Sequence, residues 1–476
     1  MSLTLLSVLP FYALVAFFSV ILWIHNAKKC SKKLPPGSMG LPWIGETLEF
    51  YKAQRKNRLF EDFVQSRIAK HGKIFKTSLM GSATVIVNGA EANRFFLSNE
   101  FKLVVSSWPS SSVELMGRNS IMERRGREHQ HIRRIIAKSL GYSGLEALVP
   151  KMCKSVQTCL DAKWSGREEV SLYKSTKSLT FTIVFECLLG IKVEEEVLKT
   201  FERVLEGVFA IPVLFPGSKF CKAKVARAEI ERMLLGIVRK MRHEMEESKD
   251  ASQKEESLLT KLVSELIHDE ITEDEVIDNI ILLVFAAHDT TSFAIAMTFR
   301  MLAHHPSCYD LLLREHMDIL RSKGGEDLEM KDITKMTYTW QVAQESMRLF
   351  PPIFGSFRKA LCDIEYQGFT IPKGWKVLWT TYGTHYNENY FKDPLSFDPS
   401  RFKEPTTMQP YVYLPFGGGP RVCAGYQLAK LHILIFVHVV VTQYNWSLLD
   451  LNEPIVVDPL PFPAHGMPIN IRPKLF

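Results

Sequence analysis

The stretch Phe416-Gly-Gly-Gly-Pro-Arg-Val-Cys-Ala-Gly425 places one cysteine in an unusual setting. An aromatic residue lies seven positions before Cys423, and an apolar run, Leu428 to Val441, follows and predicts a buried helix. A glycine-rich loop lets backbone N–H groups point at the sulfur, and the N-terminus of the following helix favours its negative charge. The stretch therefore predicts a thiolate that is presented to a metal ion.

Composition limits the other classes of function. The chain has 476 residues, 46% hydrophobic and 23% charged, which is typical of a globular protein. Its formal net charge of +7 is spread along the chain without a basic run interleaved with aromatic residues, so no nucleic-acid partner is expected. The eight cysteines contain no Cys-x-x-Cys pair, so we expect reduced thiols rather than disulfides or a zinc site.

The N-terminus predicts a membrane anchor. Leu3 to Ile24 carry no charge and are long enough to span a bilayer as a helix, and four lysines follow between positions 28 and 33. Positive charge on that flank predicts a cytosolic body. A cleaved signal peptide is the alternative. It needs a basic residue before the apolar run and a small-residue cleavage site after it, and neither is evident in the sequence. We expect an anchor over residues 1–33, a proline-rich hinge over 34–45 and one catalytic domain over 46–476.

Most of the body is predicted to be helical. Thr272-x-x-Glu275 is a capping-box pattern, and it opens an apolar run from Val276 to Leu302 that Pro306 ends. The run predicts a buried central helix of roughly eight turns. A polar segment, Ser248 to Glu256, predicts an exposed loop.

Strands are expected in two places only. One group lies near residues 73–89, and Ile364 to Thr381 predict a small hairpin around Pro372-Lys-Gly374. No alternation of strands and helices supports a parallel sheet. The fold class is therefore mainly α with a minor β region.

The central helix contains Ala286-Ala-His-Asp-Thr-Thr291. Polar residues inside a buried helix are costly unless something uses them. A threonine hydroxyl that bonds to its own helix can open a groove for dioxygen and water, and Asp289 and Thr290 are candidates for relaying protons there. The alternative is that the two residues satisfy each other where helices pack.

Glu345 and Arg348 lie one turn apart on a predicted helix. Such pairs are usually surface ion pairs of little energetic value. The apolar neighbourhood, which runs into Phe350-Pro-Pro352, favours burial instead, and a buried pair needs a third partner. Arg401 is the candidate, and the role of the three residues is expected to be structural.

His129 and Arg133 lie on one face of a predicted helix, four residues apart. Arginine binds carboxylates in bidentate fashion, so Arg133, with Arg358 and Arg421, is a candidate to bind the two propionates of a haem. The alternative is a solvated basic face. We do not expect His129 or His288 to bind a metal, because no second ligand stands at a suitable helical spacing.

Together these motifs resemble those of the cytochrome P450 superfamily, over essentially the whole chain. The resemblance implies that Phe-x-x-Gly-x-Arg-x-Cys-x-Gly supplies the axial haem thiolate, Cys423, and that the acid–alcohol pair is Asp289 and Thr290. It implies the structural network of Glu345, Arg348 and Arg401, and a haem site formed by His129, Arg133, Arg358, Phe416, Arg421, Cys423 and Gly425. Two positions depart from the family pattern, since Ala287 replaces the usual glycine before the acid and His129 replaces the usual tryptophan.

The resemblance also implies an activity. The expected fold is the P450 fold with an N-terminal transmembrane anchor in the endoplasmic reticulum membrane. The expected reaction inserts one oxygen atom of O2 into a C–H bond, with haem b (iron protoporphyrin IX) as cofactor and NADPH electrons delivered by a flavoprotein reductase. The alternatives are a hydroperoxide isomerase or dehydratase of the same fold and a non-catalytic haem sensor.

Shorter stretches are similar to plant triterpene oxidases and taxane hydroxylases, which implies an apolar terpenoid-type substrate, whether triterpenoid, diterpenoid or steroid-like hormone. They are Leu34–Gly37, Phe75–Leu79, Ser107–Pro109, Pro351–Ala360 and Ile371–Trp375. Family analogy places the pocket wall at 107–113, 285–290, 353–356 and 464–467. Val208 to Pro216 is a candidate loop for dipping into the membrane, and its alternative is an ordinary packed connection between helices.

Overall fold

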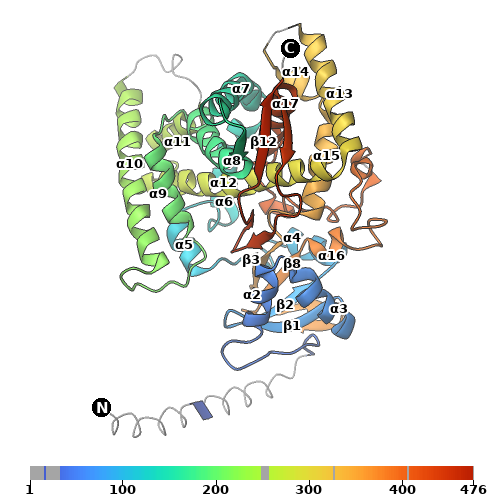
Figure 1. The fold of residues 1–476 in the computed structure, drawn as a ribbon. Coiled ribbons are helices and arrows are strands. Elements are labelled where there is room, and N and C mark those ends of the chain that lie inside the picture. Colours follow the sequence, from blue (N-terminus) through green and yellow to red (C-terminus); the bar gives the residue numbers. More distant parts are fainter. Residues whose placement is uncertain (1–15, 18–32, 248–256, 325–326, 405–406, 475–476) are drawn as a thin grey trace, which may run out of the picture.

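The computed structural model describes residues 16–17, 33–247, 257–324, 327–404 and 407–474. The predicted anchor helix and the predicted loop at 248–256 therefore lie outside the described residues, apart from Ala16 and Phe17. Figure 1 shows a large helical part and a smaller part that holds the main sheet, and α4 lies between them. The mainly helical fold with small sheets agrees with the prediction.

The helices take up most of the described chain. They are α2 (Thr47–Arg55), α3 (Ser66–His71), α4 (Ala90–Ser98), α5 (Ser110–Met116), α6 (Gly126–Leu140), α7 (Tyr142–Trp164), α8 (Leu172–Thr182), α9 (Glu195–Leu205), α10 (Lys219–Glu247), α11 (Leu258–Ile267), α12 (Glu273–His304), α13 (Pro306–Lys323), α14 (Met330–Ile333), α15 (Thr337–Leu349), α16 (Tyr382–His385) and α17 (Tyr426–Gln443).

The predicted central helix is α12. Its N-terminus has the predicted capping box, in which the Thr272 hydroxyl accepts from the Glu275 N–H and the Glu275 carboxylate accepts from the Thr272 N–H. Pro306 occupies the first turn of α13, as its fixed φ allows. The helix crosses the molecule and contacts α8, α15 and α17 (Figure 1). Contacts on all these sides explain why its sequence is apolar almost all round.

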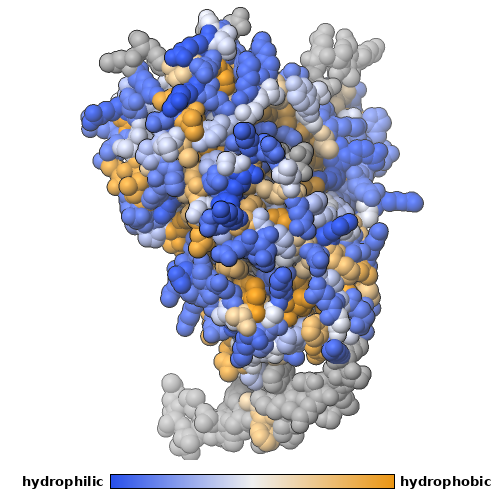
Figure 2. Space-filling model, turned by 90° about the vertical axis from the view of Figure 1, so that its right-hand side faces the viewer, coloured by the Kyte–Doolittle hydropathy of each residue, from blue (hydrophilic) through white to orange (hydrophobic). Residues whose placement is uncertain are grey.

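The predicted helix after the cysteine is α17, and it is buried along nearly its whole length. Both α12 and α17 are long and apolar enough to span a membrane, but most of each apolar window is buried inside the protein. They are core helices, and residues of both line a cavity together with Cys423. On the face drawn in Figure 2, hydrophobic residues occur in small groups within a mostly hydrophilic surface.

The main sheet has five strands in the order β1-β2-β8-β5-β3. It contains the predicted strands near residues 73–89 and brings together distant segments: β1 (Ile74–Leu79), β2 (Ser82–Val87), β3 (Val104–Ser106), β5 (Gly355–Ala360) and β8 (Lys376–Thr380). Three small sheets complete the fold. The first has three strands, β4 (Glu169–Ser171), β12 (Pro468–Pro473) and β9 (Tyr444–Leu448). The other two have two strands each: β6 (Ile364–Tyr366) with β7 (Phe369–Ile371), and β10 (Ile455–Val457) with β11 (Pro461–Pro463).

The predicted hairpin around Pro372-Lys-Gly374 is wrong. The hairpin is β6–β7, and it turns at Gln367 and Gly368, which both have positive φ values (47° and 76°). Two successive residues with positive φ form the tight turn that matches strand twist. The segment at 372–374 instead leads to β8, which pairs with β2 and β5. The strands outside the two predicted regions, which are β3, β4, β5 and β9 to β12, were not predicted.

Candidate active site

The cysteine loop is held by its own backbone. The Cys423 N–H donates to the Phe416 carbonyl at 2.9 Å, and the Phe416 ring meets Tyr426 edge-on. Gly419 has a φ of +68°, and a Cβ at this position would lie 2.1 Å from the Leu97 carbonyl oxygen of α4. Only glycine fits there, so the loop is locked against the helix beneath it.

The Cys423 thiol opens into a cavity. Burial raises its pKa, while the Gly425 N–H and the positive charge of Arg133 act in the opposite direction. A thiol with a raised pKa is a poor free nucleophile, but a bound metal ion deprotonates it. A Cβ on residue 425 would lie 3.8 Å from the sulfur, which is an ordinary van der Waals contact. The donor and its surroundings fit a metal–thiolate bond.

The cavity encloses about 2090 Å³ not filled by protein atoms, some of it open to solvent, and its lining is mainly apolar. Leu282, Phe285 and Ala286 of α12 line this cavity together with the Cys423 loop. Two buried ring nitrogens in the lining, Trp108 Nε1 and His432 Nε2, have no hydrogen-bond partner among the described residues. Haem is a large, mostly apolar group with a few polar atoms, and the size and lining of this cavity fit such a group.

The four residues predicted to bind the carboxylates all line this cavity: His129, Arg133, Arg358 and Arg421. Burial and the nearby positive charges of Arg421 and Arg133 lower the pKa of His129 to about 4, so it is neutral at pH 7. It can donate a hydrogen bond, whereas the arginines supply the positive charge. Arg421 also donates to the carbonyls of residues 121, 122 and 124, which ties the cysteine loop to the cavity wall.

The side chains of Asp289 and Thr290 have different surroundings at the edge of the cavity. Thr290 lines the cavity, and its hydroxyl donates to the Ala286 carbonyl at 2.7 Å. The Asp289 carboxylate instead pairs with Lys177 of α8 at 3.0 Å and lies 3.5 Å from the Tyr173 hydroxyl. Burial acts to raise the pKa of Asp289, but the His288 ring and Lys177 outweigh it and hold the pKa below its usual value. Asp289 is therefore ionised at neutral pH.

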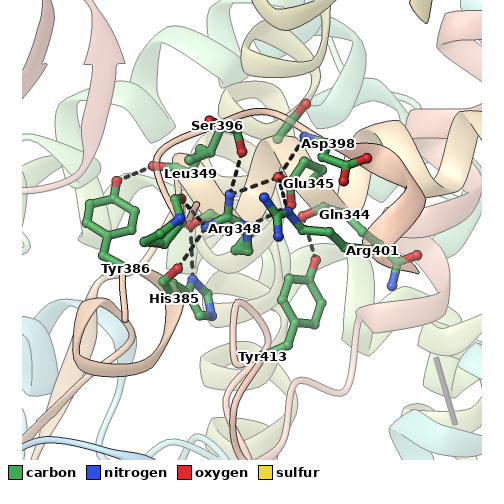
Figure 3. A network of polar contacts seen from close by, with 12 residues as sticks. Gln344, Glu345, Arg348, Leu349, His385, Tyr386, Ser396, Asp398, Arg401 and Tyr413 are labelled. Atoms are coloured by element: carbon green, nitrogen blue, oxygen red, sulfur yellow. Dashed lines mark hydrogen bonds and ion pairs between the residues drawn. The ribbon is translucent and has the colours of Figure 1, made fainter. Parts of the chain in front are cut away.

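Glu345 and Arg348, the pair on α15, are completely buried. Figure 3 shows the polar contacts that surround them. Arg348 donates to both carboxylate oxygens of Glu345, at 2.7 and 2.8 Å, and the predicted third partner, Arg401, donates to Glu345 at 3.3 Å. The Asp398 N–H also donates to Glu345. Arg348 uses its remaining donors on the carbonyls of His385, Pro394 and Ser396. The two fully buried charges, on Glu345 and Arg348, thus pair with each other, and their remaining polar atoms are hydrogen-bonded.

The same group reaches the cysteine loop. The His385 ring accepts from the Leu414 N–H through Nε2, and its Nδ1 lies 3.1 Å from the Arg348 carbonyl (Figure 3). Because Nε2 accepts, the proton is on Nδ1. Burial lowers the pKa of His385 to about 3, with help from Arg348, so the ring is neutral. Leu414 lies two residues before Phe416, so α15 and the cysteine loop are connected by hydrogen bonds.

Several residues of the site escaped the sequence analysis. Glu100 pairs with both Arg358 and Arg421, and Lys177 pairs with Asp289. The cavity lining includes Ile121 and Met122, and near the C-terminus it includes Leu460 rather than residues 464–467. No periodicity or motif marks these positions, because each meets its partner from a distant part of the chain.

Comparisons with known proteins agree with the site. The family model for cytochrome P450 matches residues 35–470. Taxane 13-alpha-hydroxylase from Taxus cuspidata is 38% identical over 97% of this chain and 96% of its own length, and beta-amyrin 28-monooxygenase from Kalopanax septemlobus is 36% identical over 98% of each. The solved structure of retinoic acid bound cyanobacterial CYP120A1 is similar with a TM-score of 0.82 and 31% identity, covering 93% of this chain and 100% of that one. The chain belongs to the cytochrome P450 family and is a haem-thiolate monooxygenase.

Proposed function

We propose that this monooxygenase hydroxylates a diterpenoid or triterpenoid. The observation that carries the proposal is the large, mainly apolar cavity above Cys423. A polycyclic hydrocarbon skeleton matches such a lining, which offers few polar groups to bind a sugar, peptide or nucleotide. The names of the relatives, a taxane hydroxylase and a beta-amyrin monooxygenase, support the same class of substrate.

The residues around Cys423 would hold the cofactor. Cys423 would bind the iron, and Arg133, Arg358 and Arg421, with His129, would hold the propionates. When bound, haem supplies the oxygen activation, and the protein supplies position, charge and control of water. Phe416 would shield the sulfur, and the apolar lining would limit the access of water to the reacting group.

Protons would reach the cavity along α12. Lys177 is partly exposed and pairs with Asp289, which lies one residue from Thr290 in the cavity wall. Because Asp289 is ionised, it would accept a proton from the solvent side and pass it on rather than store one. The Thr290 hydroxyl would hold a water or a proton at the cavity edge. The bond from this hydroxyl to Ala286 keeps it in place.

The remaining partners are a flavoprotein NADPH reductase and a membrane. We propose that residues 1–33 anchor the chain in the endoplasmic reticulum with the body on the cytosolic face, and that the loop at 208–216 contacts the lipid. In that loop Ile211, Val213, Leu214 and Phe215 are exposed, although Val208 is buried. Exposed apolar side chains in a loop suit the headgroup boundary, where a lipid-soluble substrate also collects.

The test is co-expression of the full chain with a reductase in microsomes that are supplied with NADPH, O2 and a panel of diterpene and triterpene skeletons. We expect one skeleton class to give a product heavier by one oxygen atom, with the label of 18O2 incorporated. The Cys423→Ala variant serves as the control. A chain that shows the spectrum of a thiolate-bound haem but oxidises neither class, while it oxidises fatty acids or phenolics, would contradict the proposal.

A further inference from the structure

Glu100 is the only described residue whose carboxylate pairs with two of the arginines that line the cavity. Its Oε1 lies 2.6 Å from Arg421 Nε, and its Oε2 lies 2.8 Å from Arg358 Nε. Glu100 is 3% exposed and Arg358 is 5% exposed, so these charges meet in a low-dielectric setting. The Ser106 N–H donates to Glu100 Oε1 and fixes the carboxylate from a third direction.

The neighbouring residue completes this arrangement. The guanidinium of Arg421 lies over the Phe101 ring at 4.8 Å, and that ring packs on His129 at 5.1 Å. Phe101 has a φ of +70°, which is costly for a bulky side chain and marks a backbone that its surroundings hold under strain. The turn at 100–101 therefore touches Arg421, Arg358 and His129 at once, although it is far from all three in the sequence.

A buried Arg–Glu–Arg group is an expensive way to stabilise a fold, because apolar residues of similar size usually do as well. Because the group lies on the wall of the cofactor cavity, a role in binding the cofactor explains why it is charged. Two neighbouring guanidinium groups repel each other. Burial lowers the pKa of Arg358, the positive charge of Arg421 lowers it further, and the carboxylate of Glu100 acts in the opposite direction. A carboxylate between them holds them together and reduces the net charge of the group from +2 to +1.

We propose that Glu100 is a positioning residue for haem: it orients Arg358 and Arg421 toward the propionates and sets the charge near the iron. Haem binding belongs to the family, so this inference does not depend on the proposed terpenoid substrate. Two measurable properties follow. The orientation controls how fast haem is lost, and the negative charge keeps the reduction potential low, because it disfavours the more electron-rich ferrous state.

The experiment uses the full-chain holoprotein and three variants. Haem loss is followed by transfer to apomyoglobin, and the midpoint potential is measured by spectroelectrochemical titration. Glu100→Gln removes the charge but keeps the size, and Glu100→Asp keeps the charge but shortens the reach. Glu453→Gln is the matched control, because Glu453 is 1% exposed and also accepts backbone N–H groups, but it is outside the cavity lining.

We expect Glu100→Gln to raise the midpoint potential and to speed haem loss by roughly tenfold or more, the usual cost of losing an outer-shell partner. Glu100→Asp should speed haem loss while keeping the parent potential, and Glu453→Gln should change neither property. The proposal is overturned if Glu100→Gln keeps both parent values, or if Glu453→Gln shifts them equally. If Glu100→Gln yields no holoprotein, a parent-like rate of haem loss in Glu100→Asp overturns it. Neither readout uses a substrate, so failure here is distinct from failure of the terpenoid proposal.

Discussion

The two sides of the cavity are built by different physical means. On the cysteine side, Arg348 alone makes hydrogen bonds to Glu345, His385, Pro394 and Ser396, all of them buried or partly buried. On the opposite side, the cavity is lined by apolar side chains such as Phe209 and Phe285, whose ring centroids lie 6.3 Å apart. The first side is held by directional bonds and the second by non-directional packing.

The difference shows how one fold can keep its chemistry while its substrate changes. Hydrogen bonds in a low-dielectric interior tolerate little displacement, so the cysteine loop has one geometry. Apolar contacts depend on volume and shape, so the opposite wall can be altered one side chain at a time. Changes on the cysteine side should therefore destroy the enzyme, whereas changes on the opposite side should alter what it binds.

The largest effect is expected for Arg348→Ala. The substitution removes both hydrogen bonds from Arg348 to the buried Glu345 and leaves that carboxylate with Arg401 and the Asp398 N–H only. Breaking a buried ion pair in this way costs about 3–5 kcal/mol. We expect little or no folded holoprotein, measured as the yield of the reduced carbon monoxide complex and as the midpoint of urea unfolding. Arg321→Ala is the matched control, because Arg321 also pairs with a carboxylate three residues earlier, Asp318, but on an exposed surface. It should cost less than about 1 kcal/mol, and an equal loss in both variants would break the comparison.

The next effect concerns the proton path. Thr290→Ala should leave the haem spectrum intact but lower the product formed per NADPH by roughly tenfold to a hundredfold, since a positioned proton donor contributes at least that much. Thr298→Ala removes the same kind of hydroxyl-to-carbonyl bond from the same helix, away from the cavity lining. The expected result is that Thr298→Ala keeps the parent's coupling, which is the amount of product formed per NADPH, whereas Thr290→Ala loses it. Unchanged coupling in Thr290→Ala would remove it from the proton path.

On the apolar side, Phe209→Ala should weaken substrate binding by about tenfold, because one large apolar contact in a pocket is worth about 1–3 kcal/mol. The affinity is measured by spectral titration with the terpenoid that the enzyme oxidises. The spectrum of the reduced carbon monoxide complex should be the same as that of the parent. Phe201→Ala serves as the contrast, because Phe201 packs on Phe181 and Phe185 outside the cavity lining. It should lower stability and leave the affinity unchanged. Weaker binding in Phe201→Ala with unchanged affinity in Phe209→Ala would show that the substrate does not contact Phe209.

The smallest effect is expected at the membrane loop. Replacing Leu214 and Phe215 together by serine should raise the apparent KM for a substrate presented in microsomes by roughly threefold, since partial withdrawal of two apolar side chains costs less than about 1 kcal/mol. The value of kcat should stay the same. Leu395→Ser, at a comparably exposed position, is the control and should leave KM unchanged. A parent-like KM in the double variant would favour an ordinary connection between helices.

The sequence predicted what depends on local patterns. The capping box at Thr272, the buried helix after Cys423 and the Glu345–Arg348 pair all involve residues within a few positions of one another, where helical spacing decides the contact. The position of Thr290 at the cavity wall also follows from its place on one helix face.

The parts that escaped prediction depend on long-range contacts. Glu100 meets Arg421 across 321 positions, and β8 pairs in parallel with β2, which comes from a distant part of the chain. The misplaced hairpin turn has a local cause: Gln367 has positive φ without being the glycine or asparagine that usually marks such a turn. Pro372 and Gly374 are a stronger turn signal, but they belong to a connection between two sheets.

The most direct test of the account is the reduced carbon monoxide difference spectrum of Cys423→Ser, measured beside the parent and Cys362→Ser. The parent and Cys362→Ser should show the red-shifted Soret band of a thiolate-bound haem, because Cys362 lies outside the cavity lining. Cys423→Ser should lack that band. A red-shifted band that survives in Cys423→Ser would contradict the assignment of the ligand, and with it the geometry of the whole site.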